Sequence, residues 1–258
     1  HGDNAAFDEN TLKIALRQLR QRIMAHLALR DLADGASLAE IVETMTTLAD
    51  VTTLFALESL HNDLATRYGQ PLGINGQPLH LAIIGMGKLG GRELNVSSDV
   101  DYIFVYPEDG ETAGRADGGG RIDNYDFFTR LGKKLIGSLN DVTSDGQVFR
   151  VDMRLRPNGD SGPLVCSSDM LENYFIAQGR EWERYAWIKA RVMNENNPDC
   201  APAMTTSVAK PFVFRKYLDF GAINAMRALH AQIRQEVTRK DRYEHIKLGP
   251  GGIREIEF

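Results

Sequence analysis

Two aspartates one residue apart, Asp99 and Asp101, are the first side chains whose spacing could support chemistry. Asp99 directly precedes residues 100–106 and Asp101 is the second residue of that range, an apolar and aromatic run that predicts a buried β-strand. Side chains alternate across a strand, so both carboxylates should point to one face. Neighbouring carboxylates repel unless a cation neutralises them, and Mg²⁺ takes oxygen ligands from both protein and phosphate. The alternative is two solvated acids at the start of a strand.

A third aspartate lies in residues 149–156, where apolar and charged residues alternate without exception. In a strand over residues 147–156, the apolar residues form a core face and the charged ones, Arg150, Asp152, Arg154 and Arg156, line the other. A carboxylate between arginines combines a metal ligand with cations that bind phosphate. We therefore expect Asp152 within reach of a metal shared with Asp99 and Asp101. A solvated face with cross-strand ion pairs stays open, above all for Arg150.

A glycine-rich turn, Gly85-Met86-Gly87-Lys88-Leu89-Gly90, precedes the paired aspartates. It fits the G-x-G-x-x-G pattern, but a dinucleotide-binding crossover needs a dozen or more residues before the next strand. Only nine residues separate Gly90 from Val100, which excludes a long crossover helix. No Lys-Ser or Lys-Thr follows to complete a Walker loop. What remains is either a turn whose backbone amides approach a phosphate or a tight turn without a ligand.

Helical patterns flank the segments that carry these residues. Apolar residues recur at helical spacing over residues 8–34 and 37–69, and Ser37 with Glu40 forms a capping box. The expected strands are residues 79–85, 100–106 and 147–156, and the later helices are residues 123–140, 169–178, 181–193 and 220–239. This order predicts an α+β fold, with a small mixed β-sheet between helical N-terminal and helical C-terminal regions. We place the three parts at residues 1–70, 78–166 and 167–258.

Composition narrows the class of protein. The 258 residues are 43% apolar and 25% charged, which is typical of a soluble globular protein. A net charge of -5 argues against a dedicated nucleic-acid binder. Cys166 and Cys200 are too few for a disulfide framework or a four-thiolate zinc site and fit a reducing compartment. No apolar run approaches the roughly 20 residues of a membrane span, and no signal segment is found, so we expect a cytoplasmic protein without a membrane partner.

Together these residues resemble the nucleotidyltransferase superfamily, whose pattern is a glycine turn, an Asp-x-Asp on the next strand and a third Asp on a later strand. The resemblance implies that Asp99, Asp101 and Asp152 are catalytic and hold Mg²⁺, while Arg154 and Arg156 neutralise charge in the transition state. It also implies nucleotide or phosphate binding by Gly87, Lys88, Gly90 and Ser98. The sequence departs from the superfamily at Lys88, where Gly or Ser is usual, so Lys88 contacts either phosphate or only the loop.

Further sequence motifs extend the resemblance over nearly the whole chain. They are Gly87-Lys88-Leu89-Gly90-Gly91, Ser98-Asp99-Val100-Asp101, Arg154-Leu155-Arg156-Pro157, Ser161-Gly162, Trp182-Glu183-Arg184, Lys189-Ala190-Arg191 and Gly251-Gly252-Ile253-Arg254-Glu255-Ile256-Glu257-Phe258. They resemble the family of bifunctional glutamine synthetase adenylyltransferase/adenylyl-removing enzymes, which have one half that removes AMP and one that adds it. The stretches Gly85-Met86-Gly87-Lys88, Asn95, Arg150-Val151-Asp152-Met153-Arg154, Gly179-Arg180 and Phe212-Val213-Phe214-Arg215 resemble the removing half. We therefore expect a piece of that half, truncated at its C-terminal end.

This resemblance implies a reaction and its partners. Inorganic phosphate attacks the phosphorus of the AMP–tyrosine phosphodiester on glutamine synthetase and releases ADP and free tyrosine, with Mg²⁺ as cofactor, in control of nitrogen assimilation. The implied partners are glutamine synthetase, the PII signal protein, a nucleotide and inorganic phosphate, and no nucleic acid. One alternative is adenylyl transfer from ATP to the tyrosine. Another, from a different class, is a non-catalytic helical module that binds a regulatory protein.

Several charged and aromatic residues of these stretches have two interpretations. Trp182, Arg184, Lys189 and Arg191 either close the site or form the packed and solvated faces of one helix. Glu255 and Glu257 follow two glycines near an expected helix start, which indicates structure or site support.

Overall fold

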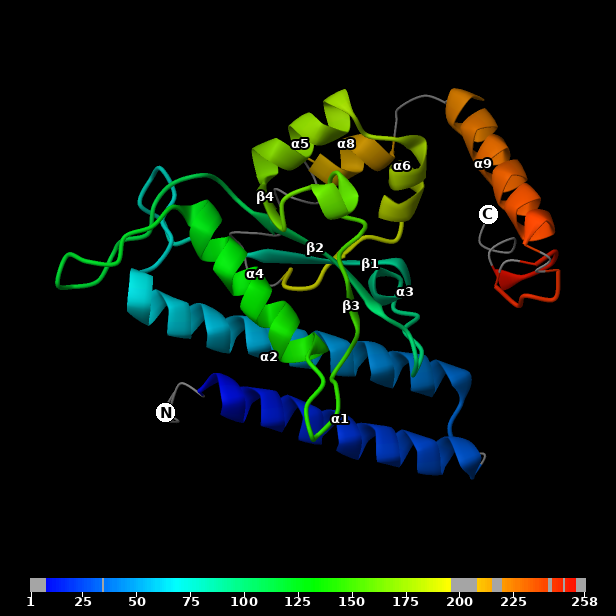
Figure 1. Cartoon of the computed structure of the whole chain (residues 1–258), viewed down its shortest axis with the longest axis horizontal. Coiled ribbons are helices and arrows are strands. Elements are labelled where there is room, and N and C mark those ends of the chain that lie inside the picture. Colours follow the sequence, from blue (N-terminus) through cyan, green and yellow to red (C-terminus); the bar gives the residue numbers. More distant parts are fainter. Residues whose placement is uncertain are drawn as a thin grey trace.

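The computed structural model describes residues 8–33, 35–195, 208–214, 220–240, 243–247 and 249–253. Figure 1 shows a small sheet with two long helices below it and short helices above it. In chain order the elements are α1 (Glu9–Leu32), α2 (Leu38–Tyr68), β1 (Ala82–Met86), α3 (Gly87–Gly90), β2 (Val100–Tyr106), α4 (Asn124–Asn140), β3 (Val151–Asp152), η1 (Gly159–Ser161), β4 (Val165–Ser167), α5 (Ser168–Ala177), α6 (Glu181–Trp187), β5 (Arg191–Val192), α8 (Lys210–Val213) and α9 (Phe220–Arg239). The described part of the chain is therefore a mixed α/β fold.

The long helices begin and end where their sequence signals lie. At the start of α1, the Asp8 carboxylate accepts hydrogen bonds from backbone N–H groups of the first turn. At the start of α2, Ser37 accepts one from the N–H of Glu40, and Gly69 ends the helix with a φ of 79°, which favours glycine. The helices predicted over residues 8–34, 37–69, 123–140, 169–178 and 220–239 are confirmed to within one or two residues.

The sheet is small and mixed, as the order of elements predicted. Its strand order is β3-β2-β1-β5, and β4 also pairs with β2. Strand β1 runs antiparallel to β2 and β5, whereas β2 runs parallel to β3 and β4. Because β1 and β2 are antiparallel, the glycine turn between them reverses the chain, and the parallel crossover of a dinucleotide-binding fold is absent from this described pair, as expected.

Both faces of the central strand β2 are buried. Tyr102, Phe104 and Tyr106 pack on the face covered by α1, α2 and α4. The alternating residues Ile103 and Val105 pack on the opposite face, with apolar side chains of α5 and α6. This double burial explains why residues 100–106 read as an almost continuous apolar run, and the strand predicted there is confirmed.

Two other strand predictions were less accurate. The strand predicted over residues 147–156 is only two residues long, Val151 and Asp152. The Asp152 carboxylate accepts a hydrogen bond of 2.8 Å from the N–H of Arg154, and the N–H of Arg156 bonds the carbonyl of Met153 at 3.2 Å, so the chain leaves the sheet in turns. The first strand is displaced by a few residues, from the predicted 79–85 to Ala82–Met86.

The helix predicted over residues 181–193 was wrong in its second half. Helix α6 ends at Trp187, and Arg191 and Val192 form β5 instead. Val192 pairs with Ile84 of β1, so pairing with the sheet overrides the helical pattern here.

Two further findings concern the cysteines and the membrane. Cys166 is a buried free thiol whose pKa burial raises to about 12, whereas Cys200 lies outside the described residues. Among the helices that the structure describes, none is long and apolar enough to cross a membrane. Arg215, Glu255 and Glu257 also lie outside the described residues.

Candidate active site

Asp101 and Asp152 lie side by side on two parallel strands. They are register partners, Asp101 on β2 and Asp152 on β3, so their side chains leave the same face of the sheet. That face is the one on which Ile103 and Val105 meet α5 and α6. The glycine turn closes in from β1: a Cβ at Gly87, whose φ is +53°, would lie 3.1 Å from Asp101 Oδ2. The turn and two of the three predicted carboxylates therefore form one site.

Asp101 is the carboxylate of this site that lacks a matching cation. Its pKa is raised to about 6, first by burial and then by the charges of Asp152 and Asp99, with Lys247 and Arg154 offsetting part of the effect. It forms no ion pair with any residue in the described ranges. A carboxylate in this environment is stabilised by either a proton or a bound cation.

The two outer carboxylates each have an arginine partner. Arg154 donates from Nε to Asp152 Oδ2 at 2.8 Å and also pairs through Nη2, which holds the pKa of Asp152 below its usual range. Arg150 pairs with Asp99, with 2.5 Å between Nε and Oδ1, and donates to the carbonyl of Ser97 at 3.0 Å. Both arginines are largely exposed, so each can exchange its carboxylate for a phosphate group without unfolding the core.

These pairings decide how the residues suit a divalent cation. Across the described residues, no group of three or more His, Cys, Asp or Glu side chains is gathered to hold a metal ion as the side chains stand. Asp99 and Asp152 instead face Arg150 and Arg154. The donor set still fits Mg²⁺ in its chemistry, because it is made of carboxylate oxygens and includes a partly buried, unmatched charge at Asp101.

Arg156 has a different setting from the one that strict alternation predicted. Its side chain is only 12% exposed and donates from Nη1 to the carbonyl of Met153 at 2.8 Å. A second bond of 3.4 Å reaches the carbonyl of Gly162, and the same guanidinium pairs with Asp160 at 3.5 Å. Arg156 therefore braces the turn that follows β3, and its placement on one strand face with Asp152 was wrong. A contact with phosphate stays a prediction.

The predicted phosphate-binding residues also have local structural roles. A Cβ at Gly90 would lie 2.0 Å from the carbonyl oxygen of Lys189, so close backbone packing alone requires glycine there. The Ser98 hydroxyl donates to Asn95 Oδ1 at 2.8 Å and holds the loop that leads to Asp99. Lys88 is half-buried and makes no ion pair within the part of the chain that the structure describes. Phosphate binding by Gly87, Lys88, Gly90 and Ser98 stays a prediction.

The Trp182-Glu183-Arg184 stretch is mainly structural. Glu183 is buried, and its carboxylate accepts hydrogen bonds from the hydroxyl of Tyr174 at 2.6 Å and the N–H of Arg180 at 2.9 Å. Arg184 pairs with Glu181 and lies over the ring of Phe212. These contacts join α5, α6 and α8. Trp182 is 39% exposed and lines a groove of about 250 Å³ between α6 and α9.

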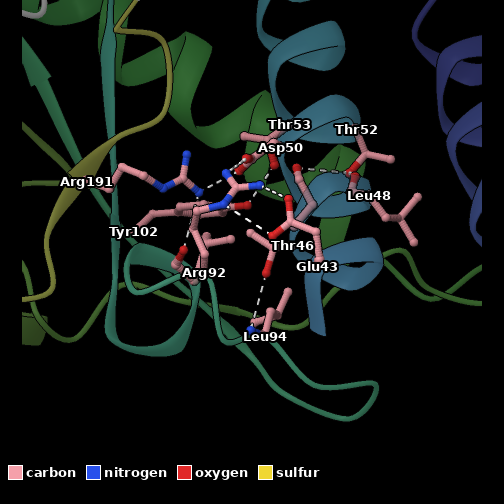
Figure 2. A network of polar contacts seen from close by, with 12 residues as sticks. Glu43, Thr46, Leu48, Asp50, Thr52, Thr53, Arg92, Leu94, Tyr102 and Arg191 are labelled. Atoms are coloured by element: carbon pink, nitrogen blue, oxygen red, sulfur yellow. Dashed lines mark hydrogen bonds and ion pairs between the residues drawn. The ribbon is translucent and has the colours of Figure 1, made fainter. Parts of the chain in front are cut away.

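Helix α2 supplies residues that the sequence pattern did not single out. Figure 2 shows Glu43, Thr46 and Asp50 of α2 directed toward the segment after the glycine turn. Asp50 Oδ1 accepts a hydrogen bond of 2.8 Å from Arg191, and Asp50 Oδ2 lies 3.4 Å from Arg92 Nη1. No local signal marks Asp50, because a charged residue on a helix usually reads as part of a solvated face.

Comparisons with known proteins place this site in a family. The model of the family described as glutamate-ammonia ligase adenylyltransferase matches residues 4–205. The chain belongs to this family. A model described as PII-uridylyltransferase matches residues 227–258. The adenylyltransferase family model thus spans the glycine turn, the three aspartates and both arginines next to them.

Curated relatives of this adenylyltransferase family are bifunctional glutamine synthetase adenylyltransferase/adenylyl-removing enzymes. The relative from Aromatoleum aromaticum is 64% identical over 99% of this chain and 26% of its own length. Those from Nitrosomonas europaea and Burkholderia pseudomallei are 59% and 58% identical over 97% of this chain and 27% and 28% of their own lengths. The chain therefore spans about a quarter of the length of the curated relatives it matches.

Proposed function

We propose that this chain carries a nucleotidyltransferase site that removes AMP from an adenylylated tyrosine of glutamine synthetase by Mg²⁺-dependent phosphorolysis. One observation supports this most directly: Asp101 and Asp152 are register partners beside the glycine turn, and Asp101 lacks a matching cation among the described residues. Membership of the adenylyltransferase family names the substrate protein. The family assignment favours an enzyme over a non-catalytic helical module.

The reaction forms one bond to phosphorus and breaks another. An oxygen of inorganic phosphate attacks the phosphorus of the AMP–tyrosine diester, the bond from phosphorus to the tyrosine oxygen breaks, and that oxygen leaves with the electron pair and takes up a proton. The products are ADP and free tyrosine. Asp99, Asp101 and Asp152 would hold Mg²⁺, which when bound orients the phosphate oxygens and offsets their charge.

The other side chains bind and position the two phosphate groups. Arg154 is an exposed cation paired with Asp152 and would exchange that contact for one with the attacking phosphate. The backbone amides around Gly87 would contact the phosphate of AMP, and Lys88 has no competing ion pair among the residues described. Arg156 would support this arrangement through the turn after β3.

The proposed direction of transfer, removal of AMP, depends on residues that are typical of only one half of the bifunctional enzymes. Met86, Asn95 and residues 150–154 resemble the removing half of the enzyme family. The same aspartates would serve the reverse transfer from ATP, since both directions pass through displacement at phosphorus. The relatives are named for both activities, so adenylyl transfer is the second candidate.

The wider setting is part of the same proposal. The match of residues 227–258 to a PII-uridylyltransferase model supports the PII signal protein as a regulatory partner. Control of nitrogen assimilation in the cytoplasm follows from glutamine synthetase as substrate. We also propose that the chain is divided into three parts, residues 1–70, 78–166 and 167–258.

The direct test follows ADP release. The chain is incubated with adenylylated glutamine synthetase, Mg²⁺ and inorganic phosphate, and ADP is quantified with and without phosphate. Phosphate-dependent ADP supports removal. Robust labelling of unmodified glutamine synthetase from ATP, with no phosphate-dependent ADP, would assign the chain to the adding half. Absence of both reactions and of Mg²⁺-dependent ADP binding would favour the non-catalytic module.

A further inference from the structure

The glycine turn is held from behind by α2, on the face of the sheet opposite the candidate site. Asp101 shares its face with Ile103 and Val105, whereas Tyr102 points the other way and exchanges a hydrogen bond of 2.7 Å with Thr53 of α2. Figure 2 shows this second side, with the helix, the segment after the turn and β5 converging on Asp50. Helix α2 thus lies behind both the turn and the strand that carries Asp101.

Asp50 is connected to the turn through Arg191. One guanidinium nitrogen of Arg191, Nη2, donates to Asp50 Oδ1 at 2.8 Å and to the carbonyl of Leu89 at 3.3 Å. The two side chains are about one-fifth exposed, 20% for Arg191 and 18% for Asp50, so solvent screens the pair less than a surface ion pair. Leu89 belongs to the glycine turn itself. Asp50 therefore sets the position of the cation that binds a turn carbonyl.

Asp50 is connected to the turn a second time through Arg92. Arg92 has a φ of +56°, in the left-handed region that costs a non-glycine residue free energy. Its guanidinium pairs with Glu43 and with Asp50, both on α2, the latter at 3.4 Å. These two carboxylates hold the strained residue in place. The backbone that leaves the turn is thereby fixed relative to α2.

Two further contacts also hold the segment that follows the glycine turn. The N–H of Leu94 donates to Thr46 Oγ1 of α2 at 3.3 Å, and Thr46 is fully buried. Lys189 pairs with Glu93 at 2.9 Å. Residues 89–94 are thus held between α2 and the segment that leads into β5, and Asp50 touches cations from both sides.

We propose that Asp50 is a positioning residue for the glycine turn, which it fixes through Arg191 and Arg92 so that the turn amides stay aligned with the phosphate of the nucleotide. This inference rests on the proposed function, in which that turn binds phosphate. Helix α2 is then part of the nucleotide site, although it contributes no group that touches the nucleotide.

Packing alone does not require a carboxylate at this position. Helix α2 is anchored in the core by its buried apolar residues, among them Met45, Ala49 and Ala56. Loss of the Asp50 charge should therefore leave the helix folded and loosen the segment that the two arginines hold. Glu40, also on α2, offers a matched control, because it forms a bidentate pair with Arg30 of α1, at 2.6 and 2.9 Å, away from the turn.

The first test does not depend on activity. Amide hydrogen exchange is compared between the unmodified protein, Asp50→Asn and Glu40→Gln, each without nucleotide. Asp50→Asn should speed exchange in residues 87–94 by about fivefold or more, while Glu40→Gln leaves that segment unchanged. Equal exchange in all three proteins would overturn the proposal. If Asp50→Asn does not fold, Arg191→Gln removes the same contact from the β5 side and replaces it.

The second test separates positioning from stability. Asp50→Asn should raise the KM for adenylylated glutamine synthetase, which carries the AMP phosphate, about fivefold with kcat within about twofold, whereas a partly unfolded enzyme loses kcat at constant KM. Glu40→Gln should match the unmodified protein in both constants. An unchanged KM in Asp50→Asn, in an enzyme that turns over, would refute the positioning role. An unmodified protein without either reaction would instead refute the proposed function, and hydrogen exchange would still decide the role of Asp50.

Discussion

Asp101 lies directly across from Asp152 on adjacent parallel strands, yet only Asp152 has an arginine partner within the described part of the chain. The pair is therefore electrically asymmetric: the pKa of Asp152 is lowered by Arg154, while that of Asp101 is raised by burial and by its acidic neighbours. A cation added to this site gains most from contact with Asp101.

Asp101→Asn should abolish removal of AMP while leaving the fold intact, since the amide keeps the shape of the side chain but cannot neutralise a cation. Turnover and circular dichroism are measured on the same sample. Asp117→Asn, in an exposed ion pair with Arg115, serves as the control and should retain full activity. Activity above a few percent in Asp101→Asn would contradict the assignment.

The same substitution should change how stability depends on pH. The folded chain holds the Asp101 proton more tightly than the unfolded chain, because the pKa rises from 3.8 to about 6. The stabilisation is complete below about pH 4 and lost as pH rises through about 6. In EDTA near pH 7.5, the free energy of unfolding measured with urea should therefore be of order 1–3 kcal/mol larger for Asp101→Asn than for the unmodified protein. Near pH 4 the two free energies should be equal. A gain that is equal at both pH values would refute this account.

Arg154→Ala should weaken the dependence on inorganic phosphate. The side chain is 73% exposed, so its removal leaves the core intact, and the lost charge-assisted contact should raise the KM for phosphate roughly tenfold or lower kcat. Steady-state rates at varied phosphate provide the measurement. Arg121→Ala removes a similarly exposed arginine paired with Glu111 and should have no effect. Unchanged kinetics in Arg154→Ala would exclude this arginine from the site.

Arg150→Gln should tighten the binding of a divalent cation. Arg150 neutralises Asp99, so its loss leaves a carboxylate available and removes a nearby positive charge. Titration with Mn²⁺, followed by electron paramagnetic resonance, should show an affinity about two- to fivefold higher, a modest change because the pair is solvent-exposed. Arg115→Gln should leave the affinity unchanged. Weaker binding in Arg150→Gln would mean that this arginine supports the cation site.

Gly90→Ala should destabilise the fold. The added Cβ would lie 2.0 Å from the carbonyl oxygen of Lys189 and 2.5 Å from that of Gly85, and backbone atoms cannot easily move away. A loss of about 3 kcal/mol or more in urea unfolding is expected. The control is Gly137→Ala in α4, where the nearest atom is 3.4 Å away and alanine favours the helix. Equal stability of the two variants would show that the segment containing Lys189 can shift freely.

The elements that local pattern fixes were predictable. Strand β2 is buried on both faces, so its apolar run stands out, and helix α2 carries its own caps at Ser37 and Gly69. The short strands were not predictable in length. β3 ends because the Asp152 carboxylate accepts a hydrogen bond from the backbone N–H of Arg154. β5 forms because Val192 pairs with Ile84 of β1. Both depend on partners rather than on periodicity.

In the candidate site, too, the features set by local sequence were predictable and those set by distant partners were not. The paired aspartates and the glycine turn are local signals, and alternation correctly directed Asp152 out of the core. The same alternation was wrong for Arg156, whose guanidinium binds carbonyls of its own turn. Asp50 was missed altogether because its partner Arg191 is 141 residues away in sequence.

The packing of α1 and α2 against the sheet has a consequence for synthesis. Thr53 meets Tyr102 across 49 residues of sequence, so this helix pair leaves the ribosome well before the strand that covers its apolar side. At roughly 5–20 residues per second, the delay is about 3–10 s. During those seconds the nascent hairpin has side chains such as Met45 and Leu60 without their final neighbours. Until β2 emerges, the apolar side of this helix pair is therefore exposed.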